Sequence, residues 1–164
     1  MKCRRLSGSD IKEYARACEA RYGAASFSKK DNVEECTAAA KEQEYRVLRV
    51  NEFPSFFIFN SVLAPTLNLM YKDARFAVLP KITVDMGAIP YVTKGSDVMR
   101  PGIVKYDPFE KGAFVVIVDE KHGKMLAVGI ALFGSKELEA IKTGRIIKTF
   151  HYVGDEFWKG AEKQ

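Results

Sequence analysis

Six consecutive apolar residues at 113–118 (Ala-Phe-Val-Val-Ile-Val) constrain the fold more than any other feature of the sequence. A strand without a polar position is typical of a sheet covered on both faces or of a barrel wall. A second apolar strand is predicted at 126–133, after a hairpin loop at 119–124. Gly129 interrupts this second strand and predicts a bulge or a tight bend. Two such strands in succession favour a β-rich core.

The rest of the second half is also rich in short strands. Strands are predicted at 81–86 and 145–153, and a helix capped by Ser135 and ended by Gly144 precedes the last strand. Several short strands with few helices in about 80 residues favour a small β-barrel.

The first 80 residues alternate strands with helices, which is typical of an α+β domain. The predicted elements are a strand at 2–7, a helix capped by Ser9 or Asp10 and ended by Gly23, paired strands at 44–50 and 56–59 joined through Asn51 and Pro54, and a short helix from Ala64-Pro65-Thr66 to about Lys72, with Thr66 as its cap.

Pro80 stands where the mixed pattern changes to a strand-rich one. The predicted fold class is therefore an α+β N-terminal domain, residues 1–79, followed by a mainly β domain, residues 80–164.

The net charge bears on the kind of binding partner, and the cysteines bear on metal binding and on the cellular compartment. Lysine and arginine number 26 against 21 acidic residues, and this mild excess is compatible with a polyanionic partner. Cys3, Cys18 and Cys36 are odd in number and widely spaced, which predicts free buried thiols, no structural metal and a reducing compartment. We expect a cytoplasmic protein that does not bind membranes, because no apolar stretch approaches a membrane span and the N-terminus lacks the apolar segment of a signal peptide.

Residues 84–103 are the most distinctive stretch of the chain. Gly87 and Gly95 flank a predicted helical turn, and Gly102 is predicted to lie within the next strand. Glycines let a ligand approach the backbone, and Lys94 and Arg100 could reach phosphates. Glycines around a short helix are also common as turns that bind nothing. The spacing fits neither a P-loop nor a dinucleotide-binding fingerprint.

Two segments of this stretch, 84–89 (Val-Asp-Met-Gly-Ala-Ile) and 94–103 (Lys-Gly-Ser-Asp-Val-Met-Arg-Pro-Gly-Ile), resemble the signature of the PUA domain. Residues 64–67 (Ala-Pro-Thr-Leu) and 151–158 (His-Tyr-Val-Gly-Asp-Glu-Phe-Trp) are similar to the family of the malignant T-cell-amplified protein and ligatin. The resemblance implies a pre-PUA domain ahead of a PUA pseudo-barrel, as in a stand-alone archaeal member.

The resemblance also implies a function. PUA domains bind structured RNA, and in this branch the expected ligand is the 3′ end of a tRNA, with the ribosome or a translation factor as partner and no cofactor. Carried over by position, the RNA-binding residues are Gly87, Ala88, Lys94, Gly95, Ser96, Met99, Arg100, Pro101 and Gly102.

Catalysis has little support in the sequence, so we expect no enzymatic activity and no catalytic residue. The two histidines, His122 and His151, lie in a predicted loop and a late strand. Tyr91 could stack on a base, although its place beside Ile89 and Val92 predicts a core residue. Two alternatives stay open: a targeting or protein-interaction subunit of an RNA-modification enzyme, and a small enzyme.

Overall fold

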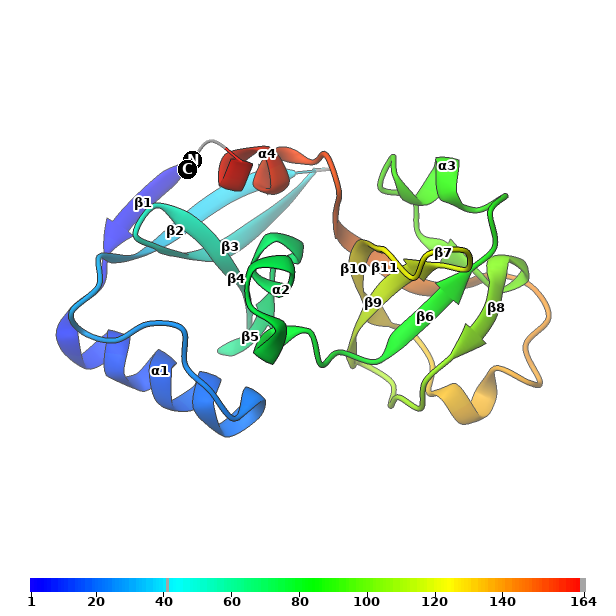
Figure 1. Ribbon diagram of the computed structural model, residues 1–164, viewed down its shortest axis with the longest axis horizontal. Coiled ribbons are helices and arrows are strands. Elements are labelled where there is room, and N and C mark those ends of the chain that lie inside the picture. Colours follow the sequence, from blue (N-terminus) through cyan, green and yellow to red (C-terminus); the bar gives the residue numbers. More distant parts are fainter. Residues whose placement is uncertain (41, 163–164) are drawn as a thin grey trace. The chain divides into compact units, whose positions relative to one another are not determined.

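The computed structural model describes residues 1–40 and 42–162, drawn as a ribbon in Figure 1. They form two compact units, one of Met1–Val78 together with the described residues from Lys159 onward, and the other of Leu79–Trp158. The domains proposed from the sequence are 1–79 and 80–164, whereas these units divide after Val78 and assign the described residues from Lys159 onward to the first unit. Helix α4 (Glu156–Glu162) contains the division between the units.

The first unit contains an antiparallel sheet with the strand order β1-β2-β3-β4-β5, so each strand pairs with its neighbour in sequence. The strands are β1 (Lys2–Arg5), β2 (Val33–Ala40), β3 (Gln43–Val50), β4 (Phe53–Phe59) and β5 (Val62–Pro65). The helices are α1 (Gly8–Tyr22), which lies along one face of the sheet in Figure 1, α2 (Leu67–Lys72) and the 3-10 helix η1 (Ala74–Phe76).

Local signals define both α-helices of this unit. Ser7 caps α1, since its side chain accepts a hydrogen bond from the Asp10 amide at 3.2 Å, so the predicted cap at Ser9 or Asp10 is wrong. Gly23 ends α1 in the left-handed conformation, as predicted. Thr66 caps α2 as predicted, and its hydroxyl also donates to the Pro54 carbonyl at 2.9 Å.

Two tight hairpins order the middle of the sheet. Asn51-Glu52 and Asn60-Ser61 have positive φ at both positions, as two-residue type I′ turns require. Pro54 lies inside β4 and not in the connection where it was expected.

Aromatic rings form the core of the first unit. Phe56 is fully buried, with the rings of Tyr22, Phe27 and Phe76 at centroid distances of 6.3, 6.1 and 5.6 Å. Such edge and stacked contacts add to the free energy of burying the rings.

The second unit contains a six-stranded sheet with the order β7-β11-β10-β9-β6-β8. The strands are β6 (Lys81–Val84), β7 (Val98–Met99), β8 (Ile103–Tyr106), β9 (Phe114–Asp119), β10 (Met125–Ala131) and β11 (Arg145–Tyr152). Strands β6 and β9 pair in parallel, and the other neighbours are antiparallel. Short helices connect them: α3 (Ile89–Val92), and the 3-10 helices η2 (Arg100–Gly102) and η3 (Ser135–Glu137).

The apolar run forms β9, and every residue of this strand is buried. The predicted bulge is confirmed, because the pairing of β10 with β11 shifts between Val128 and Gly129. Three local predictions are wrong: Gly102 lies in η2 and not in a strand, Gly134 takes the cap position expected for Ser135, and the helix expected to end at Gly144 is only the three-residue 3-10 helix η3.

The prediction of three free thiols is wrong. Cys3 and Cys36 form a disulfide, because β1 pairs with β2 in a register that places these residues opposite each other. Cys18 is free and buried, and burial raises the pKa of its thiol to about 11. The inference of a reducing compartment loses the support that it drew from free cysteines.

Candidate functional site

A cavity of about 340 Å³ opens in the second unit between two segments. One segment joins β6 to α3, and the other runs from Asp97 through β7 to η2. The lining residues are Asp85, Gly87, Ala88, Tyr91, Val92, Asp97, Val98, Met99, Pro101 and Gly102.

Backbone hydrogen bonds hold the two segments together. The Asp85 amide donates to the Gly102 carbonyl at 3.0 Å, and the Asp85 carboxylate accepts from the Ala88 amide at 2.9 Å. Gly102 permits this approach, because a Cβ atom there would lie only 3.2 Å from the Cβ of Ala88. The absence of a side chain at Gly102 therefore lets the two segments that line the cavity approach each other.

Asp97 fixes the second segment to β11. One carboxylate oxygen accepts from the Thr149 amide at 2.9 Å, and the other accepts from Arg145 Nη1 at 3.0 Å. Asp85 and Asp97 therefore bring negative charge to the lining, and each carboxylate oxygen has capacity for a second donor.

Two of the lining residues have large, exposed side chains. Tyr91 is 67% exposed and Met99 is 49% exposed, and both line the cavity. The prediction that Tyr91 is a core residue is wrong, because the single turn of α3 directs Val92 inward, where it is 2% exposed. An exposed aromatic ring next to a hollow is a suitable surface for stacking.

The structure brings five of the nine predicted residues to this cavity: Gly87, Ala88, Met99, Pro101 and Gly102. Lys94 and Ser96 are exposed in the turn between α3 and β7 and are not among the lining residues. Gly95 is buried with a φ of +85°, and its amide donates to the Val92 carbonyl, so it shapes the turn after α3.

Sequence reasoning missed five of the lining residues. Four of them lie in or near the segments that carry the PUA resemblance: Asp85, Val92, Asp97 and Val98. The sequence shows the type of each residue but not whether its side chain points into the cavity. A signal for the exposure of Tyr91 was present in the sequence. Tyr91 belongs to a helix of a single turn, which is too short to bury every one of its apolar residues.

Arg100 faces inward. Its Nε donates to the carbonyls of Leu138 and Ile141, both at 3.0 Å, and its Nη1 donates to the Ile103 carbonyl at 3.3 Å. The guanidinium therefore joins η2 to the segment after η3, a role that the predicted contact with phosphate or base did not foresee.

The histidines have structural surroundings. His151 is fully buried, with Nδ1 2.8 Å from Asp155, and Asp155 also accepts from the amides of Tyr152 and Trp158. His122 donates its amide to Asp119, and backbone donors of this loop lower the pKa of that carboxyl. In residues 1–40 and 42–162, no three histidine, cysteine or acidic side chains gather as a metal would need. None of the helices in the described part of the chain is long and apolar enough to span a membrane.

Comparison with known proteins gives this arrangement a family. The family model of the PUA domain matches residues 80–153. An uncharacterized protein of Methanocaldococcus jannaschii is 37% identical over 93% of both chains. Translation machinery-associated protein 20 of Saccharomyces cerevisiae is 31% identical over 71% of this chain and 67% of its own. The chain belongs to this family of PUA-domain proteins.

A further relative is similar in sequence, and two solved structures are similar in fold. A malignant T-cell-amplified sequence 1 homolog of Drosophila melanogaster is 35% identical over 58% of this chain and 53% of its own. The crystal structure of a PUA-domain protein of Aeropyrum pernix, 25% identical, covers 98% of this chain and 91% of its own with a TM-score of 0.74. A hypothetical protein of Pyrococcus horikoshii, 30% identical, covers 96% of this chain and 98% of its own with a TM-score of 0.71. The predicted resemblance and fold class are confirmed.

Proposed function

We propose that this PUA-domain protein binds structured RNA and receives the single-stranded 3′ end, such as that of a tRNA, in the cavity beside α3. The observation that carries the proposal is the exposed ring of Tyr91 at the edge of a hollow whose walls are fixed by backbone hydrogen bonds. Sequence-specific RNA recognition usually targets unpaired bases, which can stack on aromatic side chains.

The lining favours a base over a phosphate. Tyr91, Val98 and Met99 offer ring and apolar surface, and the charged lining residues are carboxylates. Carboxylates accept hydrogen bonds from the exocyclic amino groups of cytosine and adenine. Those two bases end a tRNA, so the chemistry of the cavity is suited to such a terminus. We assign the adjoining phosphate to Lys94, an exposed residue of the turn between α3 and β7.

The setting that we propose is translation in the cytoplasm, with the ribosome or a translation factor as partner. The support is the membership of the family and the name of its yeast member, translation machinery-associated protein 20. We assign the protein no catalytic role, since the buried histidine and the carboxylates of the cavity have structural hydrogen-bond partners.

Replacing Tyr91 with alanine tests the stacking surface. We expect Tyr91→Ala to weaken binding of a hairpin RNA with a cytosine-cytosine-adenine 3′ tail by about 1–3 kcal/mol, the usual contribution of one stacked base. Tyr91→Phe keeps the ring and should bind within about twofold of the parent. Fluorescence anisotropy at one fixed salt concentration measures both.

The exposed position of Tyr91 makes this a clean test, because its removal leaves the buried core intact. Thermal unfolding followed by circular dichroism should give the same midpoint for the parent and for both variants. If folded Tyr91→Ala binds the tailed hairpin as tightly as the parent, the base does not stack at α3.

A further inference from the structure

The disulfide joins the edge strand of the first unit to its neighbour. Strand β1 is the last strand of its sheet, and all four of its residues are exposed. Cys3 in this strand is exposed, whereas Cys36 in β2 is fully buried. Of the two bonded residues only Cys3 is open to solvent, so we take its sulfur as the one that a reductant attacks and Cys36 as the protected leaving group.

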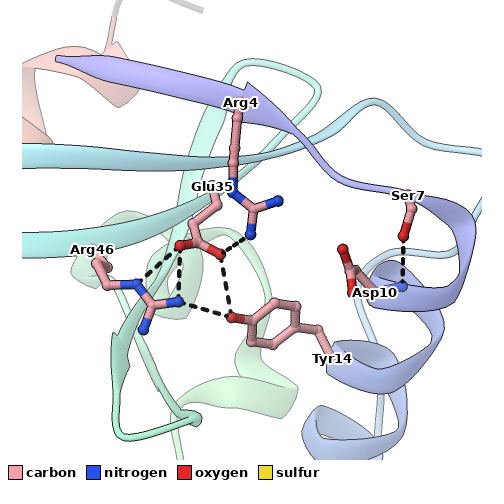
Figure 2. Close-up of polar contacts among 6 residues, drawn as sticks. All are labelled: Arg4, Ser7, Asp10, Tyr14, Glu35 and Arg46. Carbon is pink, nitrogen blue, oxygen red and sulfur yellow. Dashed lines mark hydrogen bonds and ion pairs between the residues drawn. The ribbon is translucent and has the colours of Figure 1, made fainter.

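A polar cavity of about 210 Å³ is lined by Arg4 of the same strand, on the face of the sheet opposite to the disulfide. Arg4 follows Cys3 and lies opposite Glu35, and its Nη2 is 3.2 Å from Glu35 Oε2 (Figure 2). Arg46 Nε donates to the other oxygen of Glu35 at 2.9 Å, and the Tyr14 hydroxyl lies 3.5 Å from the carboxylate. Burial, and then the charge of Glu35, raise the pKa of Tyr14.

The charge of the cavity depends on the position of β1. Its lining includes two arginines, Arg4 and Arg46, and three acidic residues, Asp10, Glu13 and Glu35. Figure 2 shows Arg4 reaching from β1 toward Glu35, while Tyr14 comes from α1. If β1 leaves the sheet, one of the two cations leaves with it and the cavity becomes more negative.

We propose that the Cys3–Cys36 bond is a reversible redox site that controls the attachment of β1 and, through Arg4, the charge of this cavity. A thiolate of a dithiol reductant attacks Cys3 Sγ, and Cys36 leaves as a thiolate that takes up a proton. The second thiol of the reductant then attacks the mixed disulfide and releases Cys3. Two electrons and two protons pass to the protein, and the reductant becomes a cyclic disulfide.

The noncovalent attachment of β1 is weak. The strand pairs with β2 over four residues, and the side chain of Arg4 is 64% exposed, so solvent screens its ion pair with Glu35. Strand β2 remains in place after reduction, because it pairs with β3 over eight residues. Glu35 likewise keeps its contacts with Arg46 and Tyr14. The opening is therefore confined to the edge of the sheet.

Hydrogen exchange of the full chain, with and without dithiothreitol, tests the proposal. The Leu6 amide, which donates to the Val33 carbonyl next to β1, should exchange at least about tenfold faster in the reduced protein. Amides of β9 and β10 in the second unit should exchange at unchanged rates. The equilibrium constant for unfolding of the first unit should be on the order of several hundredfold higher in the reduced protein than in the oxidised one. This is the effect expected when a disulfide that joins residues 33 apart in the sequence is opened.

Two variants complete the experiment. Cys3→Ser changes an exposed position and should show the fast exchange without reductant. Cys18→Ser keeps a hydrogen-bond donor to the Ala24 carbonyl and should respond to reductant like the parent. Three free thiols in the air-oxidised protein, a bond that opens only when the protein unfolds, or equal Leu6 exchange in both redox states would each overturn the proposal.

Discussion

Gly129→Ala should destabilise the second unit by about 3 kcal/mol, at the upper end of the usual cost of overpacking. A Cβ atom at this position would lie 2.4 Å from Cγ2 of Ile147 and 2.8 Å from the carbonyl oxygen of Lys148. Both residues belong to β11, which pairs with β10 around the bulge. Relief would require a shift of the paired backbone, because rotation of the Ile147 side chain cannot remove the clash with the carbonyl.

Urea unfolding measures this cost, and Gly134→Ala is the matched control. Gly134 has a negative φ, and a Cβ atom there would meet its nearest neighbours at 3.7 Å, which is ordinary van der Waals contact. We expect the control to stay within about 1 kcal/mol of the parent. Equal unfolding free energies for the two variants would show that β10 and β11 do not approach this closely.

Arg100→Ala should cost about 3 kcal/mol of stability. The substitution removes two donors of a charged group, the Nε–H that two carbonyls share and an Nη1–H. A hydrogen bond from a charged donor contributes roughly 1.5–3 kcal/mol, and water restores part of the loss at the carbonyls. Arg100→Lys should recover little, because an ammonium lacks the planar fork that reaches carbonyls on two segments.

Comparing the Arg100 variants with a variant of Lys94 distinguishes a loss of stability from a loss of RNA contact. Lys94→Ala, at an exposed position, should leave the unfolding free energy within about 0.5 kcal/mol of the parent. Urea unfolding and RNA affinity are measured on the parent and on the three variants, Arg100→Ala, Arg100→Lys and Lys94→Ala, under conditions where each is folded. Unchanged stability of Arg100→Ala together with lost affinity would mean that the guanidinium turns outward to the RNA.

The strands of the second unit were predictable because their signals are local. The apolar run becomes β9, and the bulge that Gly129 predicts lies between Val128 and Gly129. Strand β2 gave no such signal, since its sequence, Val-Glu-Glu-Cys-Thr-Ala-Ala-Ala, is poor in strand-forming residues. It is a strand because it pairs with β1 on one side and β3 on the other.

The misjudged residues depend on partners far away in the sequence. Arg100 was expected to meet RNA by its charge, but its carbonyl partners lie 38 and 41 residues further on. Cys3 meets Cys36 only after α1 has brought β1 beside β2. The two segments that carry the family resemblance border the cavity, and the tertiary contacts decided which of their side chains line it.

A titration of the ¹⁵N-labelled full chain tests the central claim, that a single-stranded 3′ end enters the cavity beside α3. Two hairpin RNAs are compared, identical except that one carries a 3′ cytosine-cytosine-adenine tail and the other ends blunt. We predict that the amide signals of Gly87, Met99 and Gly102, which line the cavity, shift with the tailed hairpin and stay in place with the blunt one. Equal shifts with both hairpins, or shifts that leave these three amides unmoved, would contradict the account.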